Sequence, residues 1–414
     1  MVFVPCLSQA ADARPLPADA PASESFLTPD AAVAAAVRLH PSVVSAQVAH
    51  QQALGEAAQL RVLLSNPSVS GSLSVDGQRS SGSVSQPLSL TGEGFAARRE
   101  ASARVEAARL RLWRAQLEAA LACRAAYANS IVRSGKVAIA EEGLELTQKL
   151  RVAVARQLEV GEASTLELRL AQLAEVQAGA RLLEAHKQQA EAVRELSALT
   201  GVSVDSFALA SDPRVVLPQA SIHSPTGPER SDLLAARASI QAATANRTRT
   251  RAAVLAPVGL GVFVSEEGPE RFVGPSVQAT LPIFDRNQAD RGAAEAALDQ
   301  ARAAEHALAA KIESERHSAK HRVFVADGLE SATLENPIAE ARTALASIDA
   351  GYRSGEVDLP STILLQKEVL TGESAALDLL GGITLARLDW LLAVEDPALL
   401  QPQEVAAGQV GGVP

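Results

Sequence analysis

The chain has 414 residues, only 3% of them aromatic, and Ala, Leu, Glu, Arg and Gln fill its long tracts. So few aromatic side chains make the compact cores of ordinary globular domains hard to fill, whereas this composition is typical of long helices and coiled coils. The formal net charge is −10 and no basic patch stands out, which argues against a nucleic-acid partner. The two cysteines, Cys6 and Cys123, form no CxxC motif and no disulfide framework.

Residues 1–27 open with an apolar run, and Ser8-Gln9-Ala10 has the small-x-small pattern of an export-signal cleavage site. The stretch fits either the end of an export signal whose basic and apolar front part is missing, or a flexible tail. Cys6 is a candidate lipid-anchor cysteine, although Pro5 stands where such an anchor needs a small residue. No run of eighteen apolar residues occurs, so we expect no transmembrane helix.

The first predicted helix spans residues 29–64. Thr28 is a suitable N-cap, and Pro29 suits the first helical position because its missing N–H has no partner there anyway. The dipeptide His40-Pro41 is expected to break or kink this helix, because proline lacks the N–H that the helical ladder needs.

Residues 66–90 change character, because Val and Leu now alternate with Ser and Gly. Asp76-Gly77 offers a turn in the middle of this stretch. Alternation on both sides of a turn signal is typical of a β-hairpin, and we predict strands at 66–75 and 82–90.

Residues 96–158 show a helical pattern without proline. At ~1.5 Å per residue such a helix would be about 90 Å long, which implies a coiled-coil or tubular assembly rather than a globular domain. A tight turn is predicted at 159–165, in which Ser164 or Thr165 can cap a returning helix that stops at Thr200.

The same plan then repeats along the chain. Three pairs of landmarks from separate stretches are related by offsets that agree within five residues, which is hard to obtain by chance. The pairs are Pro67 and Pro257 at an offset of 190, Pro87 and Pro282 at 195, and Gly161 and Gly355 at 194.

We therefore predict a mainly α fold with a small β part, built from two tandem repeats of helix, β-hairpin, long helix, turn and helix. The repeats are expected at 28–201 and 229–396, with a Pro/Ser-rich connector at 202–228. Flexible segments are expected at 1–27 and 397–414.

The second hairpin is predicted at 257–266 and 272–282, which gives four strands in one chain. Four strands cannot close a barrel and would leave open edges. Strands of about nine to eleven residues are the right length to cross a bilayer. Three chains would supply about twelve strands, which lies within the usual size range of membrane barrels.

Together these landmarks resemble those of the TolC-like outer membrane efflux proteins. The resemblance spans residues 28–395, and the stretch LPIFDRNQADRG at 281–292 resembles most closely the heavy-metal (cobalt–zinc–cadmium) branch. The other stretches that carry it are 85–93, 158–168 and 336–366.

The resemblance implies a homotrimer with a twelve-stranded β-barrel in the outer membrane of a Gram-negative bacterium and an α-helical barrel extending into the periplasm. Such a trimer would be the passive exit duct of a tripartite efflux system, in contact with outer-membrane lipid, a periplasmic adaptor (membrane fusion) protein and an inner-membrane RND-type pump. Heavy-metal cations are the expected cargo, and drugs or type I secretion substrates are the alternative. A soluble periplasmic coiled-coil protein is the rival class, which the four β-like segments disfavour.

The resemblance places the two tight turns at the periplasmic tips, where an adaptor would dock on Gly161, Glu162, Gly355 and Glu356. Acids beside turn glycines also suit the first turn of a helix, where the helix dipole favours them. Rings of acids at a tunnel mouth attract cations. The same acids can stabilise a helix start and attract cations, so both interpretations are kept.

Relatives often place Asp a few residues after the tip glycine, in an acidic ring that narrows the pore. The corresponding positions of this chain are Glu167 in the first repeat, and Ser361 and Leu364 in the second. Glu167 and Asp358 are therefore the candidate pore acids, and the position of any ring stays open.

The joints between strand and long helix are expected at Pro87 in the first repeat and at Pro282 in the second. Pro282 would end the strand ladder, and Asp285 or Asn287 would cap the helix that follows. Arg286 would then lie at the boundary between membrane and periplasm.

Glu313, His317 and His321 are spaced i, i+4 and i+8, which puts them on one face of a helix. Pairs of His at this spacing can bind zinc or copper. Arg316 and Lys320 surround them, so we favour a solvated helix face over a metal site.

The sequence offers no sign of catalysis. It contains no Ser/His/Asp order with a nucleophile elbow, no phosphate-binding glycine loop and no HExxH motif. We therefore expect neither enzymatic activity nor a cofactor.

Overall fold

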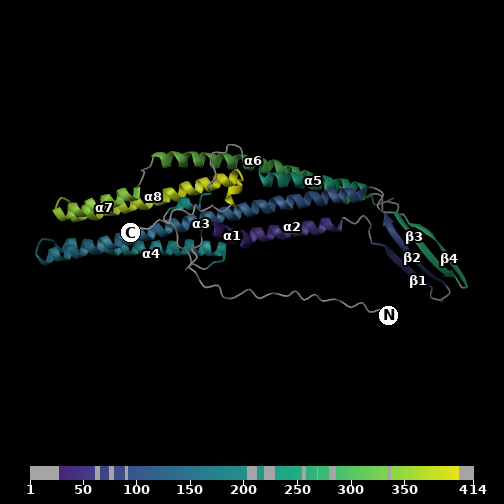
Figure 1. Cartoon of the computed structure of the whole chain (residues 1–414), viewed down its shortest axis with the longest axis horizontal. Helices are drawn as coiled ribbons and strands as arrows, with labels where there is room; N and C mark the ends of the chain where they lie inside the picture. Colours follow the sequence, from purple (N-terminus) through teal and green to yellow (C-terminus); the bar gives the residue numbers. More distant parts are fainter. Residues whose placement is uncertain are drawn as a thin grey trace, which may run out of the picture.

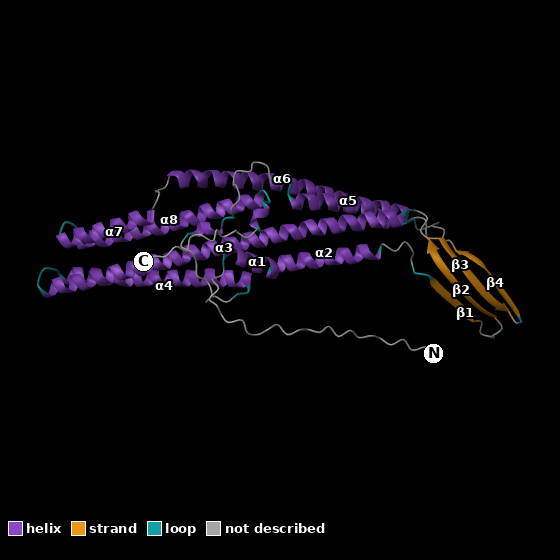
Figure 2. Ribbon diagram, in the orientation of Figure 1, coloured by secondary structure: helices purple, strands orange, loops and turns teal. Residues whose placement is uncertain are grey.

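The computed structural model describes residues 28–60, 66–73, 79–88, 92–202, 212–218, 229–253, 258–267, 269–278, 286–332 and 337–400. These residues form an elongated body with long helices along most of its length and a small β-sheet at one end (Figure 1). Figure 2 shows that the strands gather only at this end. The predicted fold class, mainly α with a small β part, is confirmed.

The first predicted helix is present as two helices, α1 (Pro29–Leu39) and α2 (Pro41–Gln59). Thr28 caps α1, because its Oγ1 accepts a hydrogen bond from the Ala31 N–H at 3.3 Å. The expected break lies at His40, whose backbone is extended and whose ring accepts a hydrogen bond from the Ser42 N–H.

All four predicted strands are present, as β1 (Ser68–Leu73), β2 (Arg79–Leu88), β3 (Val258–Glu267) and β4 (Glu270–Gln278). They form one antiparallel sheet in the order β1-β2-β3-β4. The two hairpins, which are far apart in sequence, meet where β2 pairs with β3. The edges of the sheet are therefore β1 from the first repeat and β4 from the second.

The long helices match the predicted plan in the first repeat, whereas the second repeat has two helices at the place of the one long helix. In the first, α3 (Glu93–Glu159) is followed by α4 (Thr165–Thr200), which ends at Gly201 in the left-handed conformation. In the second, α5 (Ser231–Ala252) precedes the sheet strands. The two helices at the place of the long one are α6 (Gln288–Ala332) and α7 (Pro337–Ser354), and the returning helix is α8 (Leu359–Ala393).

The helices lie side by side as four lanes around α3 (Figure 1). The first lane contains α2 and α4, and the second is α3 itself. The third contains α5 and α8, which contact the other side of α3, and the fourth contains α6 and α7. Each half of the chain thus supplies two lanes, as expected for a duplication.

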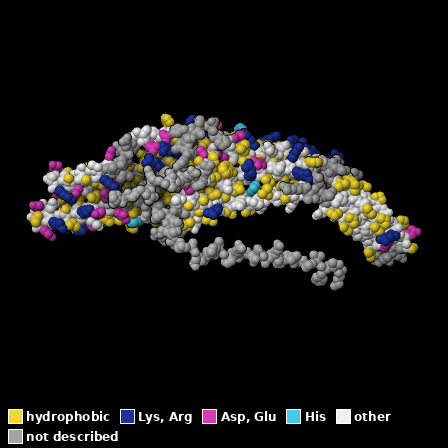
Figure 3. Space-filling view, in the orientation of Figure 1, with side chains coloured by type: hydrophobic (Ala, Val, Ile, Leu, Met, Phe, Trp, Pro, Cys, Tyr) yellow, Lys and Arg dark blue, Asp and Glu magenta, His cyan; other side chains and the backbone are white. Residues whose placement is uncertain are grey.

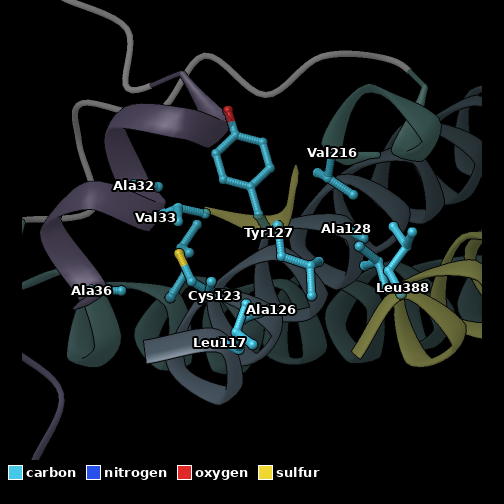
Figure 4. Close-up of a cluster of buried hydrophobic side chains, with 14 of the residues drawn as sticks. Ala32, Val33, Ala36, Leu117, Cys123, Ala126, Tyr127, Ala128, Val216 and Leu388 are labelled. Atoms are coloured by element: carbon cyan, nitrogen blue, oxygen red, sulfur yellow. The ribbon is translucent and has the colours of Figure 1, made fainter. Parts of the chain in front are cut away.

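Near the middle of α3 the chain has its largest apolar core, where α1, α3, α4 and α8 meet. Figure 4 shows Cys123 and Tyr127 of α3 beside the small side chains of α1, with Val216 and Leu388 on the other side. Burial raises the pKa of the Cys123 thiol to about 12, so this cysteine is a neutral packing residue.

Two short 3-10 helices complete this core: η2 (Pro213–Val216) and η3 (Pro397–Leu399). Val216 and Leu399 are fully buried. In the sequence the first falls within the predicted connector and the second within the predicted tail, because short turns leave no periodic signal. Packed structure therefore extends beyond residue 396.

The Arg124 guanidinium holds these segments together. It donates to the Val216 carbonyl at 2.7 Å, to the Leu399 carbonyl at 3.2 Å and to Asp30 Oδ1 at 3.0 Å. Burial lowers the pKa of the guanidinium, and Asp30 opposes this shift. Arg124 thereby connects α1, η2 and η3 to the middle of α3.

By length and composition α8 is the one helix in the described part of the chain that could cross a membrane, with a mean hydropathy of 1.3 over its most apolar window. The sequence predicts no such helix, because it contains no uninterrupted run of eighteen apolar residues. In the structure α8 packs along α3, α6 and α7, with Gln366, Glu373 and Thr384 buried. Leu377, Leu388 and Leu391 of α8 are buried in this packing, whereas Leu364, Leu365 and Leu385 are exposed.

We predict that Arg124→Met lowers the free energy of unfolding by about 3–5 kcal/mol, because it leaves Asp30 and two carbonyl groups without their buried donor. Chemical denaturation of the detergent-solubilised protein measures this loss. Arg109→Met is the matched control on the same helix, since the Arg109 side chain is 58% exposed. Equal stability of the two variants would contradict a central role for Arg124.

Candidate functional site: the helical tips and the strand-to-helix joints

The two predicted tight turns are present, and they are structural copies of one another. Gly161 and Gly355 both adopt the left-handed conformation, with φ of +80° and +76°. The next N–H groups form matching bonds, from Glu162 to the Gln157 carbonyl at 2.8 Å and from Glu356 to the Gly351 carbonyl at 2.9 Å. A side chain other than glycine would be strained at either left-handed position.

The first tip is closed by a capping box at the start of α4. The Glu167 N–H donates to Ser164 Oγ at 3.2 Å, and the Ser164 N–H donates to Glu167 Oε2 at 2.6 Å. The Ser164 hydroxyl also donates to this oxygen at 2.9 Å. These bonds stabilise the ionised carboxylate and lower the pKa of Glu167. This candidate pore acid therefore has a structural role.

The second tip begins α8 differently. Asp358 occupies the N-cap position, but its exposed side chain forms no capping hydrogen bond. The following residue, Leu359, is buried with Leu150 and Val154 of α3. Tyr352 links the two tips, because its hydroxyl donates to Gln157 Oε1 at 3.0 Å.

Acidic side chains gather at the tips. Glu159, Glu162, Glu356 and Asp358 are all exposed. Figure 3 shows acidic side chains at the ends of the helices farthest from the sheet. The structure thus brings together the residues that sequence analysis assigns to adaptor docking and to a tunnel mouth, and those roles remain predictions.

The strand-to-helix joints are only partly within the described residues. Pro87 lies in β2 opposite Gly259, and α3 begins after Gly92, which is left-handed and provides no side-chain cap. Pro282 and Asp285 lie outside the described residues. Asn287 precedes α6 with φ of +59°, and Arg286 beside it is exposed.

Glu313, His317 and His321 are exposed on α6. Within the described ranges, no three His, Cys, Asp or Glu side chains come close enough to hold a metal ion. The structure therefore does not assemble these three residues into a metal centre within one chain.

The sheet has two different faces, which the sequence shows only as alternation. One face has a ladder of serine pairs across β1 and β2, with hydroxyl oxygens 2.7–2.8 Å apart, and the exposed side chains of Phe263 and Phe272 on β3 and β4. The opposite face is apolar on all four strands and exposed, with Val69 at 77% and Val277 at 72%. Its apolar residues are Val69, Leu73, Val84, Leu88, Val258, Leu260, Val262, Val264, Val273 and Val277.

No protein-family model matches the chain, and no curated protein matches it. Solved structures do. The outer membrane protein VceC from Vibrio cholerae matches with a TM-score of 0.72 at 18% identity, over 88% of this chain and 95% of that one. The outer-membrane channel OprN matches with a TM-score of 0.73 at 18% identity, over 91% and 92%.

A third match is the CmeC outer membrane channel of Campylobacter jejuni, with a TM-score of 0.69 at 15% identity, over 88% of this chain and 85% of that one. This chain has the fold of these outer-membrane channels. At such identities the likeness concerns the channel fold alone, and it covers both repeats.

Within this channel fold the two tips differ in their caps, which gives a direct prediction. Ser164→Ala should cost about 1 kcal/mol of local stability, because it removes the capping box of α4. Asp358→Ala is the matched change at the second tip and should cost less, since its side chain makes no such bond. Amide hydrogen exchange over the first turns of α4 and α8 measures both, and equal effects would contradict the difference.

Proposed function

We propose that three copies of this chain form the outer-membrane exit duct of a tripartite efflux system in a Gram-negative bacterium. The observation that carries the proposal is the sheet, which has an apolar exposed face, a serine-rich opposite face and edges from different repeats. An exposed apolar surface of this kind, which lies outside the apolar core, needs a lipid or protein partner.

The dimensions of the sheet fit a bilayer. β2 and β3 have ten residues each. At ~3.3 Å per residue each is about 33 Å long, which at the ~35–45° tilt of barrel strands spans about 25 Å, the height of the apolar band of membrane barrels. Charged side chains mark the hairpin end, where Arg79 pairs with Glu267 and Arg271 with Glu266. Three sheets joined from β1 to β4 of the next copy would give a twelve-stranded barrel.

In such a barrel the apolar face would meet lipid and the serine face would line the lumen. The helical lanes would continue the wall as a tunnel. The sequence contains no nucleotide-binding motif to supply energy. The duct would therefore be passive and would depend on an inner-membrane RND-type pump, with a periplasmic adaptor docked at the tips around Gly161 and Gly355.

A variant pair on the two sheet faces tests the membrane barrel. Val262→Arg puts a charge near the middle of the apolar face and should cost about 2–4 kcal/mol of insertion. Ser83→Arg, on the opposite face of the neighbouring strand, should be tolerated. The full exported chain is fractionated and its oligomeric state measured. A soluble wild-type monomer would reject the proposal, as would equal insertion of the two variants.

We further propose heavy-metal cations as the cargo. The motif at 281–292 suggests it, and the exposed tip acids support it, because rings of acids concentrate cations. Drugs or type I secretion substrates are the alternative cargo.

The double variant Glu356→Gln/Asp358→Asn should lower the cation-to-anion permeability ratio of single channels severalfold, as measured by the reversal potential in a salt gradient. Glu368→Gln, an exposed acid on α8 away from the tip, is the control. Unaltered cation selectivity in the double variant would remove the support that the tip acids give.

A further inference from the structure

We propose that the groove between α3 and α5, just below the sheet, binds a phospholipid with an anionic headgroup. This inference rests on the proposed membrane barrel. The groove has a volume of about 570 Å³. Phe95 and Arg99 line it from α3, and Ile240 and Thr244 line it from α5.

The depth of the groove matches the headgroup layer. Gly92 marks the start of α3, where the sheet gives way to helix. Phe95 lies one turn below and Arg99 two turns below, so Arg99 is about 10 Å from Gly92 along the axis. The polar layer on each side of the hydrocarbon core is about 5–8 Å thick. Phe95 thus lies within this polar layer. The Arg99 backbone lies a few ångströms beyond it, and side chains on a helix lean towards its N-terminus, so the guanidinium extends back towards the level of the phosphates.

The side chains of the groove suit a lipid with a charged head. Phe95 is 66% exposed at the membrane end, where aromatic rings gather at bilayer interfaces. Small and apolar residues, including Ala96, Ala103 and Ala245, form the rest of the apolar lining.

The charge of the groove favours an anion. Arg99 is its one lining cation, is exposed, and forms no ion pair with any residue that the structure describes. Glu106 is its one lining acid, and both of its carboxylate oxygens accept from Arg109, at 2.6 and 2.8 Å. Arg99 therefore offers a free guanidinium, which suits a phosphate because it can donate two parallel hydrogen bonds.

The groove lies on the outer side of the helical layer. On the opposite face of α3, α2 and α6 approach from both sides and line small cavities with Glu100 and Arg104. When a layer of helices is curved, the helices at its two edges, here α2 and α6, approach one another on the concave face. In a closed tunnel the concave face is the one that lines the lumen. Phe95 and Arg99 therefore lie on the convex side. Another copy of the chain would pack against the lanes at the two edges of the layer, so it would not cover Phe95 and Arg99.

Lipid retention by the purified full chain tests the proposal. The protein is exchanged into mixed micelles with equimolar phosphatidylglycerol and phosphatidylcholine, and bound lipid is quantified by native mass spectrometry. We expect wild type to prefer phosphatidylglycerol about tenfold. Arg99→Gln should bring the ratio close to one, and Arg99→Lys should restore part of it. Phe95→Ala should reduce retention of both lipids.

Arg302→Gln is the matched control, because the Arg302 side chain is 61% exposed on α6 and does not line the groove. Its preference should equal that of wild type. A wild-type ratio of one, an unchanged ratio in Arg99→Gln or an equal loss in Arg302→Gln would each overturn the proposal. Failure of the chain to enter membranes would refute the barrel itself, whereas insertion without lipid preference would refute only this site.

Discussion

The buried guanidinium of Arg124 is the interaction on which the arrangement of the helices depends. Its side chain is fully buried, and it bonds to segments more than 90 residues away on both sides in sequence. A charge in such surroundings is tolerated only when its donors are satisfied. The packing of α3 at its midpoint therefore depends on η2, η3 and α1 together.

The contacts of Arg124 separate two regions of the helical layer, in which α3 packs against different helices. Towards the sheet, α3 packs against α2 and α5, and towards the tips it packs against α4 and α8. In the region towards the tips, Gly143 and Gly135 leave room on α3 for Leu370 and Leu377 of α8. Glycine at these two positions of α3 thus allows two helices from different repeats to approach closely.

Much of this fold can be predicted from the sequence, because its signals are local and repeated. Thr28, His40, Ser164 and Gly201 mark helix ends through capping and left-handed conformations that single residues specify. The hairpins follow from alternation around turns. The joint at Pro282 and Asp285 stays a prediction, because the structure does not describe those residues.

What sequence could not supply depends on distant partners. Nothing local shows that Arg124 faces η2 and η3, because those short turns have no periodicity. The structural role of Glu167, in contrast, has a local signal that sequence analysis did not use, because Ser164-x-x-Glu167 is the pattern of a capping box. Glu167 and Asp358 both follow a tip glycine, yet only Glu167 has a serine three residues before it that completes a reciprocal cap.

The unequal caps have a consequence for symmetry. Six nearly identical loops would surround the mouth of a trimer, since each chain carries the turn twice. Every second loop, however, would have the reciprocal cap of Ser164 and Glu167, and the loops between would have the free carboxylate of Asp358. A ring of subunits built from a duplicated chain would thus present threefold rather than sixfold chemistry, and a partner with six equivalent arms would meet two kinds of surface in alternation.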